Sequence, residues 1–268
     1  MQKKCALVTG ASYGLGEEFA RQLAQRGYDL LLTARSKELL ESLRLSIQSS
    51  NPDCDVRILP LDLSRYGATQ KLFLWARQQE GMSVSLLVNN AGFGALGEFD
   101  SIPLTRQRQM IDLNVSALVE LTHLFLAPMK ARRQGKILNI ASTAAFLPIP
   151  YFAVYAATKA FVLSFSNALY EEARAYGVHV MAVCPGPTAT RFLENAQSGT
   201  QESTAFRSVR SQSAPQVVAA SLRAMDRDRP WVITGKMNRL TALIAHLAPR
   251  RILLRVTAKL FHRTNTGT

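Results

Sequence analysis

The sequence predicts a single-domain α/β protein with a doubly wound parallel sheet, covered on both faces in a three-layer α/β/α arrangement. Short apolar segments alternate with longer segments of helical periodicity, which is the pattern of βαβ units. The apolar segments are flanked by helices, as strands buried on both faces are. A length of 268 residues and a hydrophobic content of 47% fit one large domain, and three scattered cysteines indicate neither a disulfide framework nor a zinc site.

Local signals place each element in turn. Gly10 ends the first strand, Gly27 and Gly177 end helices, Ser64 is expected to cap one, and Pro215 is expected to open another. The expected strands are 6–8, 30–33, 56–59, 86–88, 136–140, 178–183 and 231–233, and the expected helices are 17–26, 37–47, 65–79, 105–133, 152–176 and 215–225. A catalytic domain over 1–235 is therefore expected, with an insertion at 187–214 and an extension over 236–268.

A glycine-rich turn joins the first strand to the first helix and predicts nucleotide binding. Its glycines would allow a tight turn, close approach of the backbone to a pyrophosphate, and close helix packing. The helix N-terminus would then present free N–H groups to the phosphates. The residues expected to surround the cofactor here are Gly10, Ser12, Tyr13, Gly14, Leu15 and Gly16.

The end of the second strand favours NADP(H) over NAD(H). An acidic residue at this point would bind the ribose 2′-hydroxyl of NAD. The sequence has Arg35 instead, whose guanidinium could fork onto a 2′-phosphate.

Further along the chain, a set of motifs resembles the classical short-chain dehydrogenase/reductases, a family with a Rossmann-like fold. The resemblance spans about residues 4–235 and includes similarity to an NADP-preferring subgroup with basic C-terminal extensions, although Tyr13 stands where many such members carry a basic residue. The matching segments are Thr9–Gly16, Asp62, Asn89–Gly92, Asn114, Ser142, Tyr155-x-x-x-Lys159 and Pro185–Gly186.

Tyr155 and Lys159 carry the expected chemistry. They are four residues apart on one helix and therefore share a face. The ammonium of Lys159 is expected to lower the pKa of Tyr155 towards neutrality, so that Tyr155 can exchange a proton with a carbonyl or alcohol oxygen. Ser142 would hydrogen-bond the same oxygen. The resemblance implies that Lys159 also binds the nicotinamide ribose and that Asn114 supports a water relay to it.

The resemblance assigns further cofactor contacts by position. Asp62 would contact the adenine, with Leu63 beside it. The segment with Asn89, Ala91 and Gly92 would close the floor of the cleft or act as a structural turn, and both roles can hold together. The last contacts are expected near the nicotinamide carboxamide, from Pro185, Gly186, Thr188 and Thr190.

These observations predict an oxidoreductase that transfers a hydride between NADP(H) and a small-molecule carbonyl or alcohol substrate. An apolar, lipid-like ketone is favoured by the candidate wall residues. A non-enzymatic NADP-responsive sensor is the alternative, while the glycine spacing argues against a sugar-nucleotide epimerase. His123, His179, His246 and His262 follow no metal-ligand pattern. The wall residues are Phe93, Leu96, Phe146, Leu147, Phe152, Phe192 and Phe206.

The chain is also expected to self-associate and to work in the cytoplasm. It shows no secretory signal and no conventional spanning segment, and the apolar surface of 152–169 predicts a homo-oligomer, a dimer or a tetramer. Of the net charge of +13, seven units lie in 236–268, which has no acidic residue. That segment has apolar and basic faces, and predicts either a lid over the pocket or peripheral membrane contact. Sparse aromatic residues there argue against nucleic acid.

Overall fold

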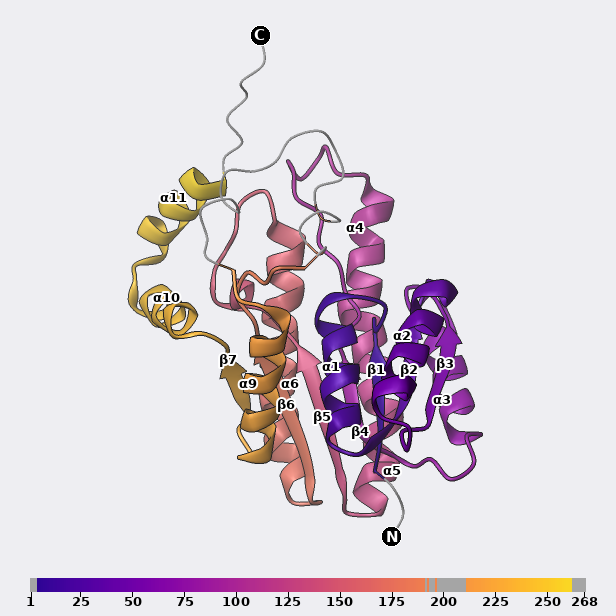
Figure 1. Ribbon diagram of the computed structural model, residues 1–268. Coiled ribbons are helices and arrows are strands. Elements are labelled where there is room, and N and C mark those ends of the chain that lie inside the picture. The colour runs from indigo at the N-terminus through magenta and orange to yellow at the C-terminus, as the bar shows by residue number, and fades with distance from the viewer. Residues whose placement is uncertain (1–3, 191, 193–195, 197–210, 262–268) are drawn as a thin grey trace.

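The computed structural model describes residues 4–190, 192, 196 and 211–261. Its centre is a seven-stranded sheet in the order β3-β2-β1-β4-β5-β6-β7, in which every neighbouring pair is parallel (Figure 1). The predicted doubly wound parallel sheet is confirmed. The strands are β1 (Lys4–Thr9), β2 (Tyr28–Ala34), β3 (Val56–Pro60), β4 (Val84–Asn89), β5 (Gly135–Ile140), β6 (Val178–Cys184) and β7 (Trp231–Ile233).

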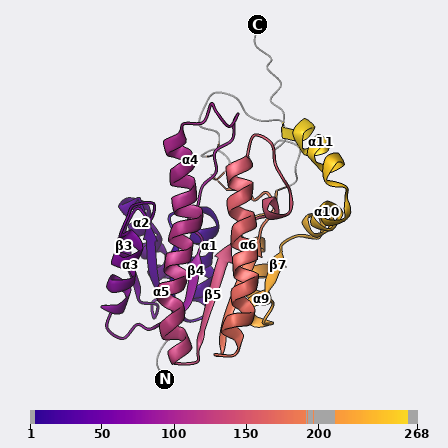
Figure 2. The ribbon, with the colours of Figure 1, turned by 180° about the vertical axis from the view of Figure 1, so that it is seen from behind.

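Helices cover both faces of the sheet and complete the three layers. One face packs against α1 (Gly14–Gln25), α2 (Lys37–Ser50) and α9 (Ala214–Asp226). The opposite face, seen in Figure 2, packs against α3 (Ala68–Arg77), α5 (Ala117–Ala131) and α6 (Ala153–Arg174). Successive strands are added towards one edge of the sheet from β1 to β3 and towards the other edge from β4 to β7. The order therefore switches between β1 and β4, and doubly wound sheets bind ligands in the crevice at such a switch point.

The predicted cap at Ser64 is wrong. Helix α3 begins at Ala68, after Gly67 with a φ of 76°. The hydroxyl of Ser64 donates instead to Oδ1 of Asp62 at 2.7 Å. A short polar side chain can bond a neighbour two residues away as readily as it caps a helix, and here the local bond wins.

The long helix expected over 105–133 is present but has an irregular centre. Helix α4 (Leu104–Ile111) and α5 are joined by η1 (Asp112–Ser116), a π-helical turn. Within the described residues, the continuous stretch Leu104–Ala131 is the one helix long and apolar enough to cross a membrane. Its buried residues, among them Leu121 and Phe125, pack against the sheet, which accounts for the apolar composition.

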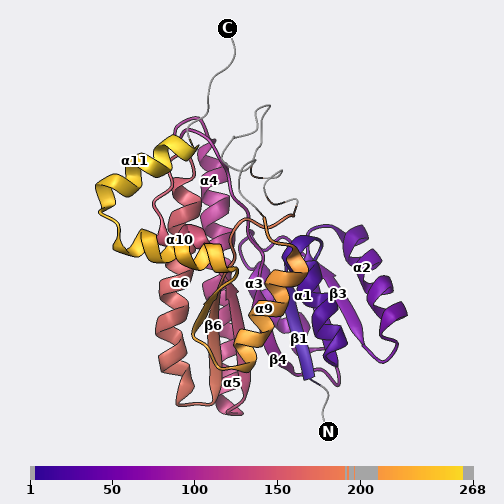
Figure 3. The ribbon, with the colours of Figure 1, turned by 60° about the vertical axis from the view of Figure 1, so that its left-hand side comes forward.

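Two helices follow the last strand, one on each side of Pro249. Helix α10 spans Lys236–Leu247 and α11 spans Arg250–Phe261. They lie together at one side of the molecule, beyond β7 and α6 (Figure 3). Most of the predicted insertion at 187–214 lies outside the described residues. Its two ends meet, because Thr188 and Gln212 form a parallel β-bridge.

Candidate active site

The glycine-rich turn after β1 is shaped by contacts that leave no room for side chains. Gly10 and Gly14 have φ values of +64° and +65°, a region that favours glycine. A Cβ on Gly16 would lie 2.2 Å from the carbonyl oxygen of Gly10. Helix α1 begins after Tyr13 with no side-chain cap, so its first N–H groups are available to an anion. The turn therefore fits the phosphates of a dinucleotide.

Two residues that the sequence reasoning missed hold this turn in place. The Nδ2 of Asn90 donates to the carbonyl oxygens of Thr9 and Gly10 at 2.9 and 3.1 Å. The hydroxyl of Thr9 accepts the backbone N–H groups of Asn90 and Ala91, both at 3.0 Å. The β1 turn and the turn after β4 thus form one unit. The motifs Thr-Gly and Asn-Asn-Ala-Gly contained the signal, because both place polar groups where adjacent strands end.

Buried hydrogen bonds hold Asn89, which was predicted to form part of the cleft floor or a structural turn. Asn89 is buried, and its Nδ2 donates to Thr122 and to Oδ1 of Asn139. Gly92 lies closer to the reacting groups, because a Cβ on it would be 2.9 Å from Oδ1 of Asn114 and 3.6 Å from Nζ of Lys159. Asn89 therefore has a structural role, since its side chain links β4 to α5 and β5. Gly92 lies beside the candidate catalytic residues.

Arg35 and Asp62, predicted to contact the adenosine part of the cofactor, lie near enough for their charges to interact. Arg35 is exposed directly after β2. Burial acts to raise the pKa of Asp62, but hydrogen bonds from Ser64 and the charges of Arg35 and Arg65 outweigh it, so the pKa lies below its ordinary value. Leu63 is buried with the side chains of α3 and packs in the core.

Tyr155 and Lys159 lie on the buried face of α6, as predicted. The Nζ of Lys159 lies 5.7 Å from the centroid of the Tyr155 ring and donates to the carbonyl oxygen of Ile140 at 2.7 Å. The ring of Tyr155 stacks on Phe152 at 4.3 Å between centroids. Both reactive side chains are held in a nearly dry position at the carboxyl end of the sheet.

The predicted lowering of the Tyr155 pKa is wrong for this structure. Burial raises the pKa of Tyr155 to about 12, and the hydrogen bond with the Ser142 side chain offsets this only in part. Burial also lowers the pKa of Lys159 to about 8. The sequence reasoning counted the attraction of a nearby ammonium and omitted the cost of charging two buried groups.

Asn114 and Ser142 approach Tyr155 from two other elements. Asn114 lies in η1, where its amide exchanges two hydrogen bonds with the backbone of Phe93 and also donates to Thr158 at 3.2 Å. π-Helical turns of this kind often occur at functional sites. Ser142 caps η2 (Thr143–Phe146), where its hydroxyl accepts the N–H of Ala144 at 3.1 Å. The structure therefore gathers the four predicted catalytic residues in one region.

The loop after β6 lies against the glycine-rich turn. A Cβ on Gly14 would lie 3.2 Å from Cβ of Thr190, so this loop touches the glycine-rich turn. Pro185 accepts the N–H of Thr143 through its carbonyl oxygen at 2.8 Å. The hydroxyl of Thr188 donates to Gly186 at 2.9 Å.

Gln212 and Asn238 secure this loop, and the sequence reasoning missed both. The N–H of Gln212 donates to Pro187, and its side-chain oxygen accepts the hydroxyl of Thr234 at 2.9 Å and Nδ2 of Asn238 at 3.3 Å. A Cβ on Gly186 would lie 2.2 Å from Nδ2 of Asn238. Helix α10 is therefore part of the support of the loop after β6, which was predicted to contact the nicotinamide. No local motif marks these residues, because they meet only through the fold.

Most of the candidate wall residues gather around Tyr155. Phe93, Leu96, Leu147, Phe152 and Phe192 belong to one apolar cluster with it, whereas Phe146 packs in a neighbouring cluster with Ala242 of α10. Phe206 lies outside the described residues.

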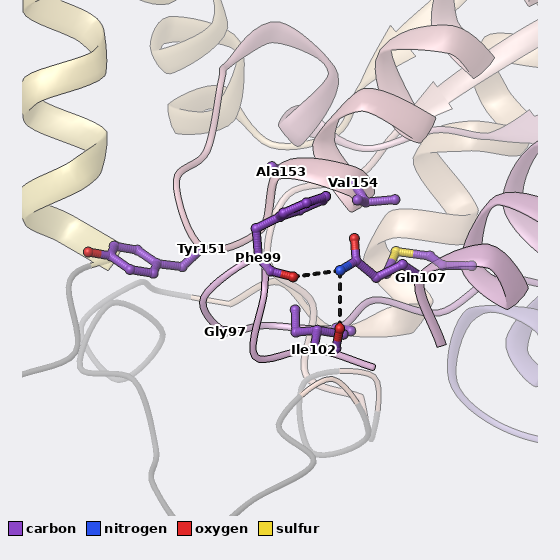
Figure 4. Close-up of a pocket in the computed structure, with 9 residues that line it drawn as sticks. Gly97, Phe99, Ile102, Gln107, Tyr151, Ala153 and Val154 are labelled. Atoms are coloured by element: carbon purple, nitrogen blue, oxygen red, sulfur yellow. Dashed lines mark hydrogen bonds between the residues drawn. The ribbon is translucent and has the colours of Figure 1, made fainter. Parts of the chain in front are cut away.

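A small hollow adjoins this cluster (Figure 4). Gln107 shapes the loop on one side by donating to the carbonyl oxygens of Phe99 and Ile102, at 2.6 and 3.2 Å. The hollow is lined by Ala95, Gly97, Phe99, Ile102, Gln107, Met110, Tyr151, Ala153 and Val154.

Comparison with known proteins agrees with this geometry. A family model described as short chain dehydrogenase matches residues 4–201. The chain belongs to the short-chain dehydrogenase family. The predicted family and fold are thereby confirmed.

Among curated relatives, this family member is 32% identical over 199 residues to very-long-chain 3-oxoacyl-CoA reductase-A of Danio rerio, covering 71% of the chain and 60% of the relative. It is 32% identical over 203 residues to 17-beta-hydroxysteroid dehydrogenase type 3 of Mus musculus, covering 74% and 65%. The matches thus span less than two thirds of the length of these relatives.

Solved structures match over almost the whole chain. A short-chain dehydrogenase from Sphingobium yanoikuyae in complex with NADPH has a TM-score of 0.80 at 28% identity, covering 99% and 98% of the two chains. The bulky-bulky ketone specific alcohol dehydrogenase from Comamonas testosteroni has a TM-score of 0.77 at 26% identity, covering 100% and 98%. A family member from Burkholderia phymatum in complex with NAD has a TM-score of 0.81 at 25% identity, covering 95% of each. A nicotinamide cofactor is therefore supported, and the structural neighbours include one complex with NADPH and one with NAD.

Proposed function

We propose that this short-chain dehydrogenase reduces an apolar, lipid-like ketone with NADPH, and catalyses the reverse oxidation of the alcohol. The observation that carries the proposal is the position of Tyr155, whose ring lies among apolar side chains while its hydroxyl is hydrogen-bonded with Ser142. An apolar ketone can pack on that cluster and direct its oxygen to the two hydroxyls.

The state of Tyr155 suits a general acid. With a pKa of about 12, its phenol carries a proton at neutral pH and can give it to the oxygen of a carbonyl as negative charge develops there. Ser142 would share that oxygen as a second hydrogen-bond partner. The nicotinamide cofactor, when bound, supplies the hydride. Lys159 is placed to help return a proton to Tyr155, because its Nζ lies near the ring and its lowered pKa eases proton release.

The chain offers a complete set of groups to hold the cofactor. The uncapped start of α1 and the glycines before it would bind the phosphates, Arg35 the 2′-phosphate, and Asp62 the adenine. The positive charge beside the ribose position and the absence of an acidic residue at 35 support NADP(H) over NAD(H). Both cofactors occur among the structural neighbours.

The proposed substrate class rests on the apolar cluster and on the relatives. The named relatives include a very-long-chain 3-oxoacyl-CoA reductase, a hydroxysteroid dehydrogenase and a bulky-ketone alcohol dehydrogenase. We propose a cytoplasmic homo-oligomer, in which the exposed side of α6 with Ala157, Phe161 and Ser164 meets its symmetry mate. Peripheral contact with a membrane is proposed through the C-terminal helices.

The test compares wild type with a Tyr155→Phe variant on NADPH and a panel of aliphatic, steroid-like and polar ketones. We expect turnover to fall by about 10²-fold or more in the variant, because the proton donor is lost while the ring packing remains. NADPH affinity is expected to stay within about twofold. Tyr170→Phe is the matched control, since this tyrosine lies on the same helix and its hydroxyl donates to Asp228 instead.

Equal turnover in wild type and the Tyr155→Phe variant would remove Tyr155 from the mechanism. Tight NADPH binding without turnover on any ketone would favour the alternative of a non-enzymatic sensor. Preference for the polar ketones would contradict the proposed substrate class.

A further inference from the structure

Helix α10 is amphipathic in the reverse of the usual sense. The side that faces the protein carries small or polar residues, Asn238, Ala242 and Ala245, and Ala242 packs in the cluster with Phe146. The large apolar residues point the other way and are between 48% and 73% exposed. These are Met237, Leu240, Leu243, Ile244 and Leu247.

Helix α11 repeats this arrangement. Thr257 is buried on its inner side, where its hydroxyl bonds the backbone of Leu253. Ile252 and Val256 are 57% and 49% exposed on the opposite side. Arg251, Arg255 and Lys259 are exposed as well, at i, i+4 and i+8. We call the exposed residues of both helices the outer face, and they include Lys236 and Arg239.

The outer face is therefore apolar and positively charged at once. The sequence has no Asp or Glu from Arg229 to Thr268, so no acidic side chain of this segment neutralises it. The two helices project beyond the sheet at one side of the molecule (Figures 1 and 3). With Leu254, which is also exposed, the two helices carry eight exposed large apolar side chains; these cost free energy in water and mark an interaction surface.

We propose that the outer face docks on an anionic lipid surface. Apolar side chains enter the boundary between headgroups and acyl chains, while basic side chains meet the lipid phosphates. Each helix has 12 residues and is about 18 Å long, shorter than the hydrocarbon core of about 30 Å, so the pair lies in the interface and does not span it.

The charge pattern favours lipid over the other occupants. A second copy of the chain related by a two-fold axis would bring the same basic residues together, and the segment holds no acidic residue to pair with them. The apolar residues of α10 also point away from the protein, so this stripe does not form the lid that the sequence left open.

The experiment is co-sedimentation of the full-length protein with vesicles of phosphatidylcholine alone, or with about 30% phosphatidylglycerol, at low and high salt. We expect wild type to bind the anionic vesicles at low salt and to be released as salt rises. Leu240→Glu with Ile244→Glu should weaken binding by more than about tenfold, because the apolar insertion is lost. Arg251→Gln with Arg255→Gln should weaken it by about 25-fold, at about fivefold for each charge.

Two double variants match these changes elsewhere on the surface. Leu45→Glu with Leu74→Glu alters exposed leucines of α2 and α3, and Arg223→Gln with Arg227→Gln removes two charges at α9. Both controls should bind as wild type does. Far-ultraviolet circular dichroism and thermal unfolding report whether each variant is folded.

Wild type that stays in the supernatant at low salt overturns the proposal, and so does equal loss of binding in the control variants. Sedimentation velocity adds a further check. The outer face is a subunit interface, and the lipid proposal is wrong, if wild type is an oligomer that does not bind vesicles while the variant Leu240→Glu with Ile244→Glu is a monomer. None of these outcomes depends on the identity of the ketone.

Discussion

Replacing Lys159 with Met is expected to stabilise the nucleotide-free protein while abolishing its activity. Burial lowers the pKa of Lys159 from 10.5 to about 8. The side chain is therefore still protonated at neutral pH, but it binds that proton less strongly in the folded protein than in the unfolded chain. At somewhat more than 1 kcal/mol per pKa unit, this difference costs roughly 3 kcal/mol at pH 7. Methionine has a similar length and no charge.

The gain is smaller than this cost, because the substitution also removes the 2.7 Å hydrogen bond to the carbonyl oxygen of Ile140. Leaving a buried acceptor unpaired costs about 1–3 kcal/mol, which leaves a net stabilisation of up to about 2 kcal/mol at pH 7. Buried ionised groups at active sites commonly exchange stability for function in this way.

The pH dependence gives the sharper test. A lysine whose folded pKa is lowered destabilises the fold in full below that pKa, and the penalty disappears as the pH rises towards the unfolded value. The stability of the variant relative to wild type should therefore fall by roughly 2–3 kcal/mol between pH 7 and pH 10. Urea unfolding of both proteins across this range measures it. Lys71→Met, which removes a charge from an exposed site on α3, should not gain stability at pH 7.

A difference between Lys159→Met and wild type that stays constant from pH 7 to pH 10 would refute the reasoning. A variant that is less stable than wild type at both pH 7 and pH 10 would also refute it, because the lost hydrogen bond would then cost more than the buried charge.

Three further predictions follow from the site and the fold. Gly16→Ala should weaken NADPH binding by at least about tenfold and lower stability by about 1–3 kcal/mol, since its Cβ would lie 2.2 Å from the backbone of Gly10. Gly27→Ala is the control, because there is open space around its Cβ and its φ is +77°. It should lose about 1–2 kcal/mol of stability without loss of NADPH affinity in a fluorescence titration. Arg35→Asp should lower NADPH affinity and raise the relative kcat/KM for NADH, and an unchanged ratio would remove Arg35 as the phosphate ligand. Sedimentation velocity at micromolar concentration should show an oligomer, and Phe161→Glu on the exposed side of α6 should dissociate it; a monomeric wild type would contradict the proposed assembly.

The sequence was sufficient for the fold and for the placement of Tyr155 and Lys159 on one helix face, because both follow from local patterns. Strands such as 178–183, which is apolar except for His179, stand between helical segments, and the Tyr155/Lys159 spacing needs only a helix to bring the two together. Helix beginnings were harder to predict. Ser64 has the right chemistry for a cap, but its bond to Asp62 and the left-handed backbone at Gly67 decide where α3 starts.

Electrostatics and long-range contacts were beyond local reasoning. The pKa of Tyr155 depends on how completely α6 and its neighbours exclude water, and no spacing rule reports that. Asn238 and Gln212 are 26 residues apart and reach the loop at Gly186 only after the extension has folded back. The crowding at Gly186 becomes visible only in three dimensions.

Helix α10 also shows why a periodic apolar stripe does not by itself identify a buried face. The stripe Met237, Leu240, Ile244 and Leu247 has the spacing of a packed helix, yet the structure buries the opposite side. The backbone of α10 lies so close to the loop after β6 that a Cβ on Gly186 would meet Asn238, and side chains as small as Ala242 and Ala245 suit the rest of that contact. Close packing at the loop therefore leaves the large residues on the outside. One helix thus supports the cofactor-side loop with its inner face and presents an apolar, basic surface with its outer face, which joins the two proposals for this protein in a single element.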